Sequence, residues 1–538
     1  MKRKKLIGSY YTPGFLADFV VDYLSHYLIL NDNIDVLEPS VGDGVFIKSL
    51  NNNLFPKTDK IISITAIEKY KQELEKAIVE SKNNSSKKVQ FTFYKTDFLK
   101  IQKELPKKFS CVLGNPPYIK RRFLNKTLIE LGKSIYKSAG LSESAFKNIW
   151  SLFLIRCSEL LTEDGILAFV LPSELLQVKF SQVIRSYLLA NFERIEVFTF
   201  DELLFKQIGQ DTVLLICFKK HLEKGQYFVQ IKDHSQLKQK SFLLSSNLSL
   251  SDTSIKWTNH ILNSDEIELM MKLKKSLNAI NYYCESKPGI VTAANDYFII
   301  DGKLEREYDL KHFTTPIIKK GFFVNGSIVF SETDLKQLEL SEKPSKLINL
   351  NNVAFCNLSD KAKDYILSGK NQNIHKRYKC TVRENWYNVP NIGAPPGGFF
   401  FKRSHFYPKL LINEAKVLVT DSAYKINMRD KYSIQNMVFS FYNSFTLAFA
   451  EMEGRYYGGG VLELTPSEFK SLPIPFTDLR SSNFTSYKNE FENKSSIKEI
   501  LEKYDEMILC SKLKITHETV SQIQKIYDKL INKRFRRN

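Results

Sequence analysis

The chain has 538 residues, of which 43% are hydrophobic and 25% are charged, a balance that predicts a folded protein of two domains and excludes a disordered chain. No apolar run approaches the roughly eighteen residues that span a bilayer, and the basic start, Met1–Lys5, lacks the apolar core of a signal peptide, so we expect a cytoplasmic protein. The formal net charge of +19 favours a polyanionic partner such as nucleic acid, although a lysine-rich composition alone also yields basic proteins. The seven cysteines form no C-x-x-C pair, which predicts reduced core thiols and no metal site.

The first half of the chain alternates short apolar runs with helical stretches, a pattern typical of an α/β fold with a doubly wound parallel sheet. Ligands of such sheets bind outside the carboxyl ends of the strands, so the residues just after each strand are the informative ones. The predicted strands are Ile34–Glu38, Ile61–Glu68, Gln90–Tyr94, Phe109–Leu113, Ile166–Leu171, Ile195–Phe198 and Thr212–Phe218, with a further edge strand at Gly225–Lys232.

The second half has a different character. A serine-rich segment after Phe242, from Ser245 to Ser251, predicts a linker, so we expect a first domain over residues 1–242 and a second over 243–538. Short strands such as Lys409–Ile412 among aromatic and glycine-rich loops indicate a mixed α+β domain. Helical periodicity from Lys494 to Lys533 predicts a helical C-terminal tail.

Acidic residues follow the first three predicted strands. The first strand ends at Glu38 and leads into a turn with Gly42 and Gly44, where a ligand can approach the backbone closely. Glu68 ends the second strand, twenty-four positions after Gly44, where nucleotide-binding folds place the acid that binds ribose hydroxyls. Asp97 follows the third strand and can accept from an adenine amino group, although capping a loop is an equal alternative.

The fourth strand leads into Asn115-Pro116-Pro117-Tyr118, a rigid polar loop. An amino nitrogen conjugated with a purine ring is a poor nucleophile because its lone pair is delocalised. The Asn115 amide oxygen and the Pro116 carbonyl can hold its hydrogens so that the lone pair points at a methyl donor, which is catalysis by positioning and electrostatics. Tyr118 can stack on an extruded base.

In this order the motifs resemble the gamma class of amino-methylating DNA methyltransferases of bacterial restriction-modification systems. The resemblance covers roughly residues 8–220 and implies a Rossmann-like class I methyltransferase domain that uses S-adenosyl-L-methionine, followed by a target-recognition domain. Asn at the head of the Pro-Pro-Tyr motif implies transfer to the N6 amino group of a flipped-out adenine in duplex DNA. The implied cofactor-binding residues are Tyr11, Thr12, Pro13, Glu38, Pro39, Ser40, Gly42, Gly44, Glu68, Asp97, Phe98 and Asn115.

The same class has an aromatic residue in a late hairpin that stacks on the target base. Phe205 matches that context, so the predicted catalytic residues are Asn115, Pro116, Pro117, Tyr118 and Phe205. An ordinary core phenylalanine is a strong alternative, because the chain has 39 of them.

A glycine-rich segment from Glu453 to Leu464 resembles the end of a target-recognition region, and Arg455 within it can reach a phosphate or a guanine. A structural turn is an equal alternative. The predicted DNA-binding residues are Lys120, Arg121, Arg122, Lys376, Arg377 and Arg455. We expect a monomer whose partners are double-stranded DNA and a cognate restriction endonuclease encoded separately.

Three alternatives stay open at this point. The same loop serves methyltransferases that act on RNA or on protein glutamine. A DNA-binding specificity protein with an inactive methyltransferase fold is a second alternative, which the intact Asn115 and Glu68 disfavour. Glu414-Ala415-Lys416 matches half of a metal-nuclease signature, but without a Pro-Asp partner we expect a strand that carries these residues by chance.

Overall fold

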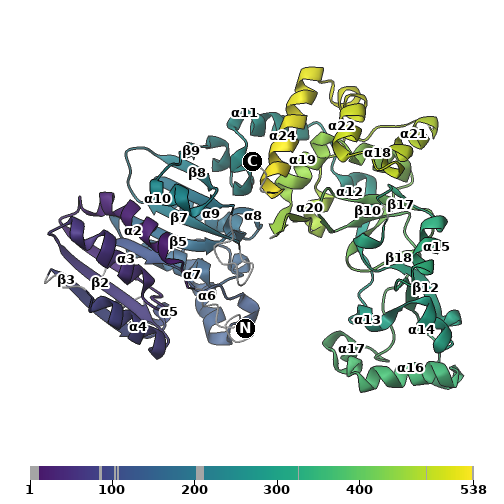
Figure 1. Ribbon diagram of the computed structural model, residues 1–538, viewed down its shortest axis with the longest axis horizontal. Helices are drawn as coiled ribbons and strands as arrows, with labels where there is room; N and C mark the ends of the chain where they lie inside the picture. Colours follow the sequence, from purple (N-terminus) through teal and green to yellow (C-terminus); the bar gives the residue numbers. More distant parts are fainter. Residues whose placement is uncertain are drawn as a thin grey trace. The chain divides into compact units, whose positions relative to one another are not determined.

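The computed structural model describes residues 11–83, 88–101, 104–105, 108–201, 211–324, 326–457, 459–479 and 481–535. Contacts within the chain divide it into two units, one ending at Ser264 and one beginning at Asp265. Figure 1 labels the elements of both. Within the described residues, no helix is long and apolar enough to cross a lipid bilayer.

The serine-rich segment after Phe242 is not an open linker. Ser245–Ser246 form strand β9 of the first unit's sheet, and Asn247 donates from Nδ2 to the Leu262 carbonyl at 2.6 Å. Trp257 is fully buried and donates from Nε1 to the Leu250 carbonyl at 3.1 Å. The apolar side chains within this segment attach it to the first unit. The first unit therefore ends at Ser264, later than the boundary at residue 242 that the composition predicted.

The first unit contains a nine-stranded sheet in the order β3-β2-β1-β4-β5-β7-β6-β8-β9. The first five strands in this order, β3, β2, β1, β4 and β5, are parallel to one another, and β7 lies antiparallel between β5 and β6. This confirms the predicted doubly wound α/β sheet. The strands are β1 Asn33–Glu38, β2 Ile61–Glu68, β3 Val89–Lys95, β4 Phe109–Gly114, β5 Leu161–Pro172, β6 Arg194–Phe200, β7 Thr212–Phe218, β8 Gly225–Ile231 and β9 Ser245–Ser246.

Two strands differ from the prediction. Strand β5 begins at Leu161 rather than Ile166, because a register shift opposite Phe109 to Cys111 extends its pairing with β4. The predicted edge strand β8 pairs with both β6 and β9, so the edge is β9.

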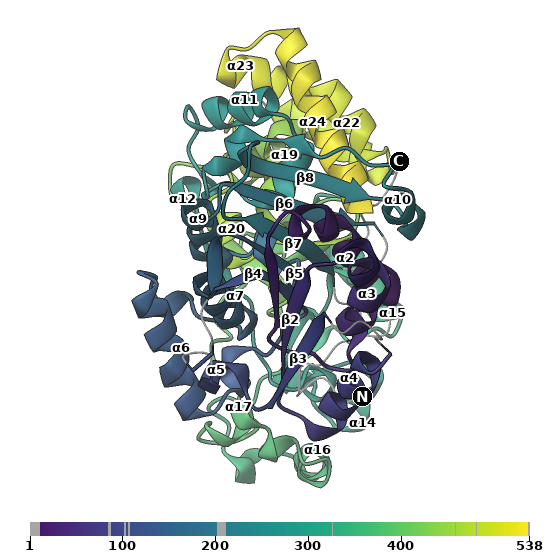
Figure 2. The same ribbon diagram turned by 90° about the vertical axis from the view of Figure 1, so that its left-hand side faces the viewer.

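Helices cover both faces of this sheet. Apolar side chains of α2 and α3 form one core cluster with alternate residues of the strands, such as Val36 and Ile64. The strand residues between them, whose side chains point to the other face of the sheet, are also fully buried; Leu37 and Val112 are examples. Figure 2 shows α2 and α3 on one side of the strands and α7 and α9 on the other. The helices are α2 Gly14–Leu28, α3 Val45–Asn53, α4 Lys71–Ser81, α5 Phe98–Ile101, α6 Lys126–Ser138, α7 Trp150–Glu159, α8 Glu174–Gln177, α9 Ser181–Asn191 and α10 His234–Gln239.

The second unit has three small sheets, in the orders β10-β19-β15-β17-β13, β11-β14-β12-β18 and β16-β21-β20, which fits the expected mixed α+β domain. Its strands are β10 Cys284–Pro288, β11 Ile299–Ile300, β12 Thr314–Ile318, β13 Val329–Phe330, β14 Lys346–Ile348, β15 Gly398–Phe401, β16 Arg403–Ser404, β17 Leu410–Asn413, β18 Leu418–Val419, β19 Ala423–Met428, β20 Arg455–Tyr457 and β21 Val461–Glu463. Its helices are α11 Ser264–Lys274, α12 Ile280–Tyr283, α13 Asn295–Phe298, α14 Gly302–Glu307, α15 Glu332–Leu340, α16 Asp360–Asn371, α17 Tyr378–Thr381, α18 Ile434–Phe441, α19 Ser444–Glu453, α20 Pro466–Lys470, α21 Ser481–Glu492, α22 Ile497–Asp505, α23 Ser511–Leu513 and α24 His517–Phe535.

Two expectations for this unit need correction. Glu414, Ala415 and Lys416 form the turn after β17, with Lys416 at φ +51°, and are not part of a strand. Two cysteines are not core thiols, since Cys356 is exposed and Cys510 is half-buried.

The helical tail is interrupted and anchored. Lys514 is left-handed, with φ +55°, and separates α23 from α24, so the periodicity does not correspond to one helix. Near the end of α24, Arg534 donates from Nε to both carboxylate oxygens of Glu451 in α19, at 2.8 and 3.1 Å, and both side chains are fully buried. Arg534 also donates to the carbonyls of His405, Phe406 and Gly460. This one side chain therefore connects α24, α19 and two loops.

We predict that Arg534→Met lowers the free energy of unfolding of the second unit by about 3–5 kcal/mol, because it leaves the buried Glu451 carboxylate without its partner. Arg403→Met is the matched control, since its ion pair with Glu463 has an arginine side chain that is 68% exposed, and it should cost less than about 1 kcal/mol. Urea unfolding of both variants measures the difference. Equal effects would show that burial does not set the strength of the Arg534 pair.

Candidate functional site

The strand order of the first unit reverses between β1 and β4, which is where doubly wound sheets bind ligands. Leu37 of β1 and Val112 of β4 are partners in register, so the loops that follow these two strands start side by side. Ser40 in the first loop donates from Oγ to the main-chain oxygen of Asn115 in the second, at 3.3 Å.

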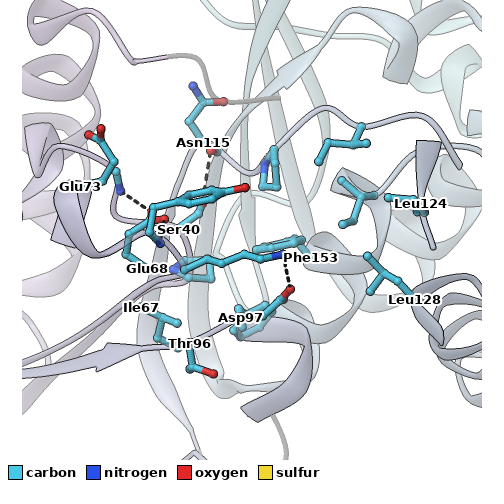
Figure 3. A pocket seen from close by; sticks show the side chains of 18 of the residues that line it. Ser40, Ile67, Glu68, Glu73, Thr96, Asp97, Asn115, Leu124, Leu128 and Phe153 are labelled. Atoms are coloured by element: carbon cyan, nitrogen blue, oxygen red, sulfur yellow. Dashed lines mark hydrogen bonds and ion pairs between the residues drawn. The ribbon is translucent and has the colours of Figure 1, made fainter. Parts of the chain in front are cut away.

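A pocket of about 510 Å³ opens at this edge of the sheet (Figure 3), within the size range of small-molecule sites. Its lining residues come from the ends of four neighbouring strands and the segments that follow them, from α6 and α7, and from Tyr11 ahead of α2. They are Tyr11, Pro39, Ser40, Gly42, Ile67, Glu68, Lys69, Tyr70, Gln72, Glu73, Thr96, Asp97, Phe98, Asn115, Pro117, Ile119, Phe123, Leu124, Asn125, Leu128, Ile149 and Phe153.

The Glu68 carboxylate fixes the glycine-rich turn. Its Oε2 accepts from the Gly42 N–H at 3.1 Å and its Oε1 from the Tyr70 N–H at 2.8 Å. Burial raises the Glu68 pKa, and these N–H donors oppose the rise. Gly44, at φ +86°, begins α3, and a Cβ there would lie 2.8 Å from the Ala77 Cα, so both its conformation and its contact with α4 require glycine.

Glu38 is a buried carboxyl without a full set of partners. It is 1% exposed, and its Oε2 has no hydrogen-bond partner. Burial holds the Glu38 pKa well above its usual range, and the charges of Asp43 and Glu68 raise it further. A cationic group placed beside it would satisfy the oxygen and favour the ionised form.

Asp97 has two partners in the structure. Its Oδ1 accepts from the Leu99 N–H at 3.2 Å, so it caps the start of α5. Its Oδ2 lies 3.2 Å from Lys69 Nζ. Beside it, the Phe98 and Phe153 rings, with centroids 5.1 Å apart, supply an apolar wall.

The Asn115 loop is fixed by Tyr118. The Tyr118 hydroxyl lies 2.7 Å from Asn115 Oδ1 and 2.9 Å from the Val170 carbonyl of β5, so its single hydrogen has two acceptors in reach. The tyrosine thereby connects the Asn115 carboxamide to the end of a buried strand.

The structure brings most of the predicted cofactor residues together. Tyr11, Pro39, Ser40, Gly42, Glu68, Asp97, Phe98 and Asn115 line the pocket, as does Pro117 of the predicted catalytic loop. Thr12, Pro13, Glu38, Gly44, Pro116 and Tyr118 are near neighbours in the chain that do not line it. Phe205 lies outside the described residues.

The basic residues that follow the Asn115 loop have aromatic or acidic neighbours. The Arg121 guanidinium lies 5.7 Å from the Phe146 ring centroid, and that of Arg122 lies 4.8 Å from the Phe123 ring. Lys120 Nζ is 4.0 Å from Glu174 and its side chain is 58% exposed. Phe123 also lines the pocket, so the basic segment adjoins the pocket itself.

In the second unit, Arg377 lines a separate cavity of about 530 Å³, and Lys376 beside it is exposed. Arg377 donates from Nη1 to the Ala293 carbonyl at 3.0 Å, and Ala293 is left-handed at φ +71°. The cavity is lined by Val291, Thr292, Ala293, Ala294, Asn295, Arg377, Tyr378, Lys379 and Asp421. Arg455, by contrast, is held in an ion pair, with Nε 3.1 Å from Glu468 Oε1.

Sequence reasoning missed part of the pocket wall. Ile149 and Phe153 reach it because the segment after the catalytic loop pairs with the segment before α7: the Ile149 N–H donates to the Ile119 carbonyl at 2.9 Å. Lys69 was also missed, although its place directly after Glu68 was a signal. Leu128 belongs to the amphipathic helix α6 and Leu124 lies just before it, in a segment that carries no local motif.

Two family profiles match successive parts of the chain. Residues 23–205 match the Eco57I restriction-modification methylase family, and residues 254–509 match the C-terminal domain of Type II methyltransferase M.Eco57I. Type II methyltransferase M.AccI of Acinetobacter calcoaceticus is 23% identical over 94% of this chain and 94% of its own length. RM.Eco57I of Escherichia coli, a Type II restriction enzyme and methyltransferase, is 28% identical over 36% of this chain. The matched part is only 19% of that protein's length.

Solved structures share the fold. The Type IIL restriction-modification enzyme MmeI, solved in complex with DNA, superposes with a TM-score of 0.58 at 10% identity, over 97% of this chain and 74% of its own. A DrdV–DNA complex gives 0.50 at 13% identity, over 91% of this chain and 57% of its own. The predicted Rossmann-like class I methyltransferase domain, followed by a mixed α+β domain, is thus confirmed.

Together the two profiles and M.AccI identify the protein as a DNA methyltransferase of the bacterial restriction-modification type, as the resemblance predicted.

The Glu38 carboxyl gives the ligand-free protein a characteristic pH dependence. A carboxyl whose folded-state pKa is raised ionises first in the unfolded chain, so its contribution to stability is present below the unfolded pKa and is lost as pH rises through the folded pKa. We therefore predict that Glu38→Gln becomes more stable relative to the parent as pH rises above about 4.5. Chemical denaturation across pH measures this, with the exposed Glu75→Gln as control. A difference that does not change with pH would contradict the raised pKa.

Proposed function

We propose that the protein is a site-specific adenine DNA methyltransferase, which transfers a methyl group from S-adenosyl-L-methionine to the N6 amino group of an adenine flipped out of duplex DNA. The observation that carries the proposal is the position of Asn115 in the wall of the pocket, directly after β4 at the reversal of the sheet. Its carboxamide oxygen accepts from Tyr118, and its main-chain oxygen accepts from Ser40 in the loop after β1.

The residues present fit the cofactor. Glu68 would accept from the ribose hydroxyls, Asp97 from the adenine amino group, and the Phe98 and Phe153 rings would border the purine. Glu38 does not line the pocket, but its buried Oε2 has no partner and would suit the ammonium group of the methionine end. When bound, the cofactor supplies a sulfonium methyl that needs no metal to activate it.

The catalytic loop would act on the target nitrogen by positioning. The Asn115 amide oxygen has two lone pairs, and the Tyr118 hydroxyl has the Val170 carbonyl as an alternative acceptor, so Asn115 can accept from the incoming amino group without leaving Tyr118 unpaired. The new bond between the nitrogen and the methyl carbon would replace the bond from that carbon to the sulfonium sulfur, which leaves as a neutral thioether, so the positive charge passes to the nitrogen. The Asn115 and Pro116 oxygens would stabilise that charge until the nitrogen releases its extra proton to water.

The second unit would hold the DNA. Its cavity combines Arg377 and Lys379 with the Tyr378 ring, which is 81% exposed, and cations interleaved with aromatic rings suit nucleic acid. One Arg377 nitrogen is committed to the Ala293 carbonyl, and the guanidinium has further donors for a phosphate or a base edge. Arg455 would contribute only if it leaves Glu468, so we assign the contact first to Arg377 and the neighbouring Lys376.

Two alternatives are weaker. RNA or protein glutamine as substrate would not call for a second unit of this size. M.AccI, which is similar over nearly the whole chain, is named as a Type II methyltransferase. An inactive specificity protein would not need a polar pocket with Glu68, Asp97 and Asn115 at one edge. A separately encoded endonuclease is the partner we expect from the restriction-modification family.

Asn115→Ala is predicted to bind S-adenosyl-L-methionine within about twofold of the parent and to lose methyl transfer by a factor of at least about 10², the effect of removing one transition-state acceptor. Calorimetry measures binding, and transfer of tritiated methyl groups to duplex DNA measures activity. The exposed Asn83→Ala is the control. Comparable turnover in the Asn115 variant would remove the proposed mechanism.

Tyr118 and Phe205 are predicted to sandwich the extruded base. Replacing either by Ala should cost roughly 1–3 kcal/mol of stacking in DNA turnover, with cofactor affinity unchanged, and the loss should shrink when the target adenine is mismatched. A 2-aminopurine at the target position should brighten on binding the parent protein, and brighten further with either variant. If Phe205→Ala unfolds the protein or changes neither signal nor rate, Phe205 is a core residue and another ring forms the clamp.

A further inference from the structure

The cavity of the second unit holds an arginine and an aspartate that do not pair with each other. Arg377 precedes α17 and Asp421 lies between β18 and β19, and both line the cavity of about 530 Å³ beside Val291–Asn295. Among the residues that the structure describes, neither side chain has an ion-pair partner within 4.0 Å. The cavity therefore offers a ligand one cationic donor and one anionic acceptor at the same time.

Asp421 is fixed at the edge of the cavity by a close approach of two segments. A Cβ at Gly289 would lie 2.2 Å from the Thr420 carbonyl oxygen, so only glycine lets the segments come this near. Ile290 then pairs with Thr420, and the Asp421 N–H donates to the Ile290 carbonyl at 2.9 Å. The aspartate is thereby held beside the start of the loop Val291–Asn295.

Two arginines hold that loop, and only one of them is exposed. Arg377 donates from Nη1 to the Ala293 carbonyl at 3.0 Å, and Arg383 donates from Nη2 to the Thr292 carbonyl at 2.8 Å. Ala293 is left-handed at φ +71°, a strained conformation that persists where surrounding contacts impose it. Arg383 is half-buried with its guanidinium 5.4 Å from the Phe298 ring centroid, so it supports the loop. Arg377 is exposed and has donors beyond its one bond to the loop.

The two charges select a base edge over a phosphate group. A phosphate would be attracted by Arg377 and repelled by Asp421. In the major groove, guanine presents the acceptors O6 and N7, and its partner cytosine presents the N4 amino donor. Arginine matches the first set and a carboxylate matches the second, whereas the adenine of an A·T pair offers an arginine only one acceptor. A G·C pair thus gives both side chains a complementary partner.

We propose that Arg377 and Asp421 read one G·C base pair of the recognition sequence, with Arg377 donating to guanine O6 and N7 and Asp421 accepting from cytosine N4. This rests on the proposed function, because it takes the substrate to be duplex DNA. Lys376 and Lys379 are exposed on either side of Arg377 and contact the neighbouring phosphates. The cavity therefore sets one position of the methylated sequence.

The test begins with the recognition sequence of the parent protein. Single-molecule sequencing of genomic DNA from a methylation-free host that expresses the parent gives this sequence, which should contain at least one invariant G·C pair. Fluorescence anisotropy then measures binding of purified protein to duplex oligonucleotides that carry it, and to a set in which each G·C pair in turn is replaced by A·T. Arg377→Gln and Asp421→Asn should both lose discrimination of about tenfold or more at the same G·C pair and keep it at every other pair.

The sign of the Asp421→Asn effect separates base reading from phosphate binding. If the carboxylate accepts from cytosine, the variant should bind the intact sequence about tenfold more weakly, whereas at a phosphate site removing the negative charge should strengthen binding. Arg377→Lys keeps the charge without the two-pronged donor geometry, so it should also lose discrimination at that pair. Lys336→Met, in an exposed lysine of α15 that does not line the cavity, should behave like the parent. Thermal unfolding of each variant confirms that the fold is kept; if Arg377→Gln loosens the loop and unfolds, Arg377→Lys and Asp421→Asn carry the test.

Three outcomes would overturn the proposal. If Asp421→Asn binds every duplex more tightly, the cavity holds the DNA backbone. If the Arg377 and Asp421 variants change discrimination at different pairs, or at none, the two residues do not read one base pair. If the parent produces no N6-methyladenine, the proposed function itself fails and the reading of a base pair fails with it, whereas methylation at an unchanged sequence by all variants overturns the reading alone.

Discussion

Leu37 of β1 and Val112 of β4 pair at the point where the strand order of the sheet reverses, and the candidate site depends on this pairing. Because of this pairing, the glycine-rich turn after β1 and the Asn115 loop after β4 begin next to each other, and a hydrogen bond from Ser40 to Asn115 links the two loops. Parallel pairing of β2 and β3 brings Glu68 and Asp97 to the same edge. One arrangement of strands thus supplies the polar groups that a nucleoside and an amino group require.

The site residues that could be predicted from sequence are those carried by local motifs. Glu68 ends the apolar strand β2 and Asn115 directly follows the apolar strand β4, so the position of each is fixed by its own strand. Phe153 and Ile149 could not be predicted, because they reach the pocket through a pairing between segments about thirty residues apart in the chain. Lys69 was overlooked because charge at a strand end usually indicates only a solvated surface.

In the fold, too, the features set by local sequence could be predicted and those set by distant contacts could not. The strand pattern of the first unit predicted its sheet, since buried parallel strands are continuous apolar runs. The segment from Ser245 to Ser251 predicted a linker because of its polar composition, yet Leu250 and Trp257 anchor the region. In the second unit, strands of two to six residues leave too little periodicity to read. The burial of Arg534 depends on groups from three other parts of the chain, at Glu451, His405–Phe406 and Gly460.

The central claim is that this site methylates adenine at N6, and the methylated base itself gives the most direct test. Genomic DNA from a methylation-free bacterial host expressing the protein can be digested to nucleosides and analysed by mass spectrometry. The account predicts N6-methyldeoxyadenosine above the level of the empty-vector host and no N4-methyldeoxycytidine. N4-methyldeoxycytidine as the product, or no modified nucleoside from a folded protein that binds the cofactor, would contradict it.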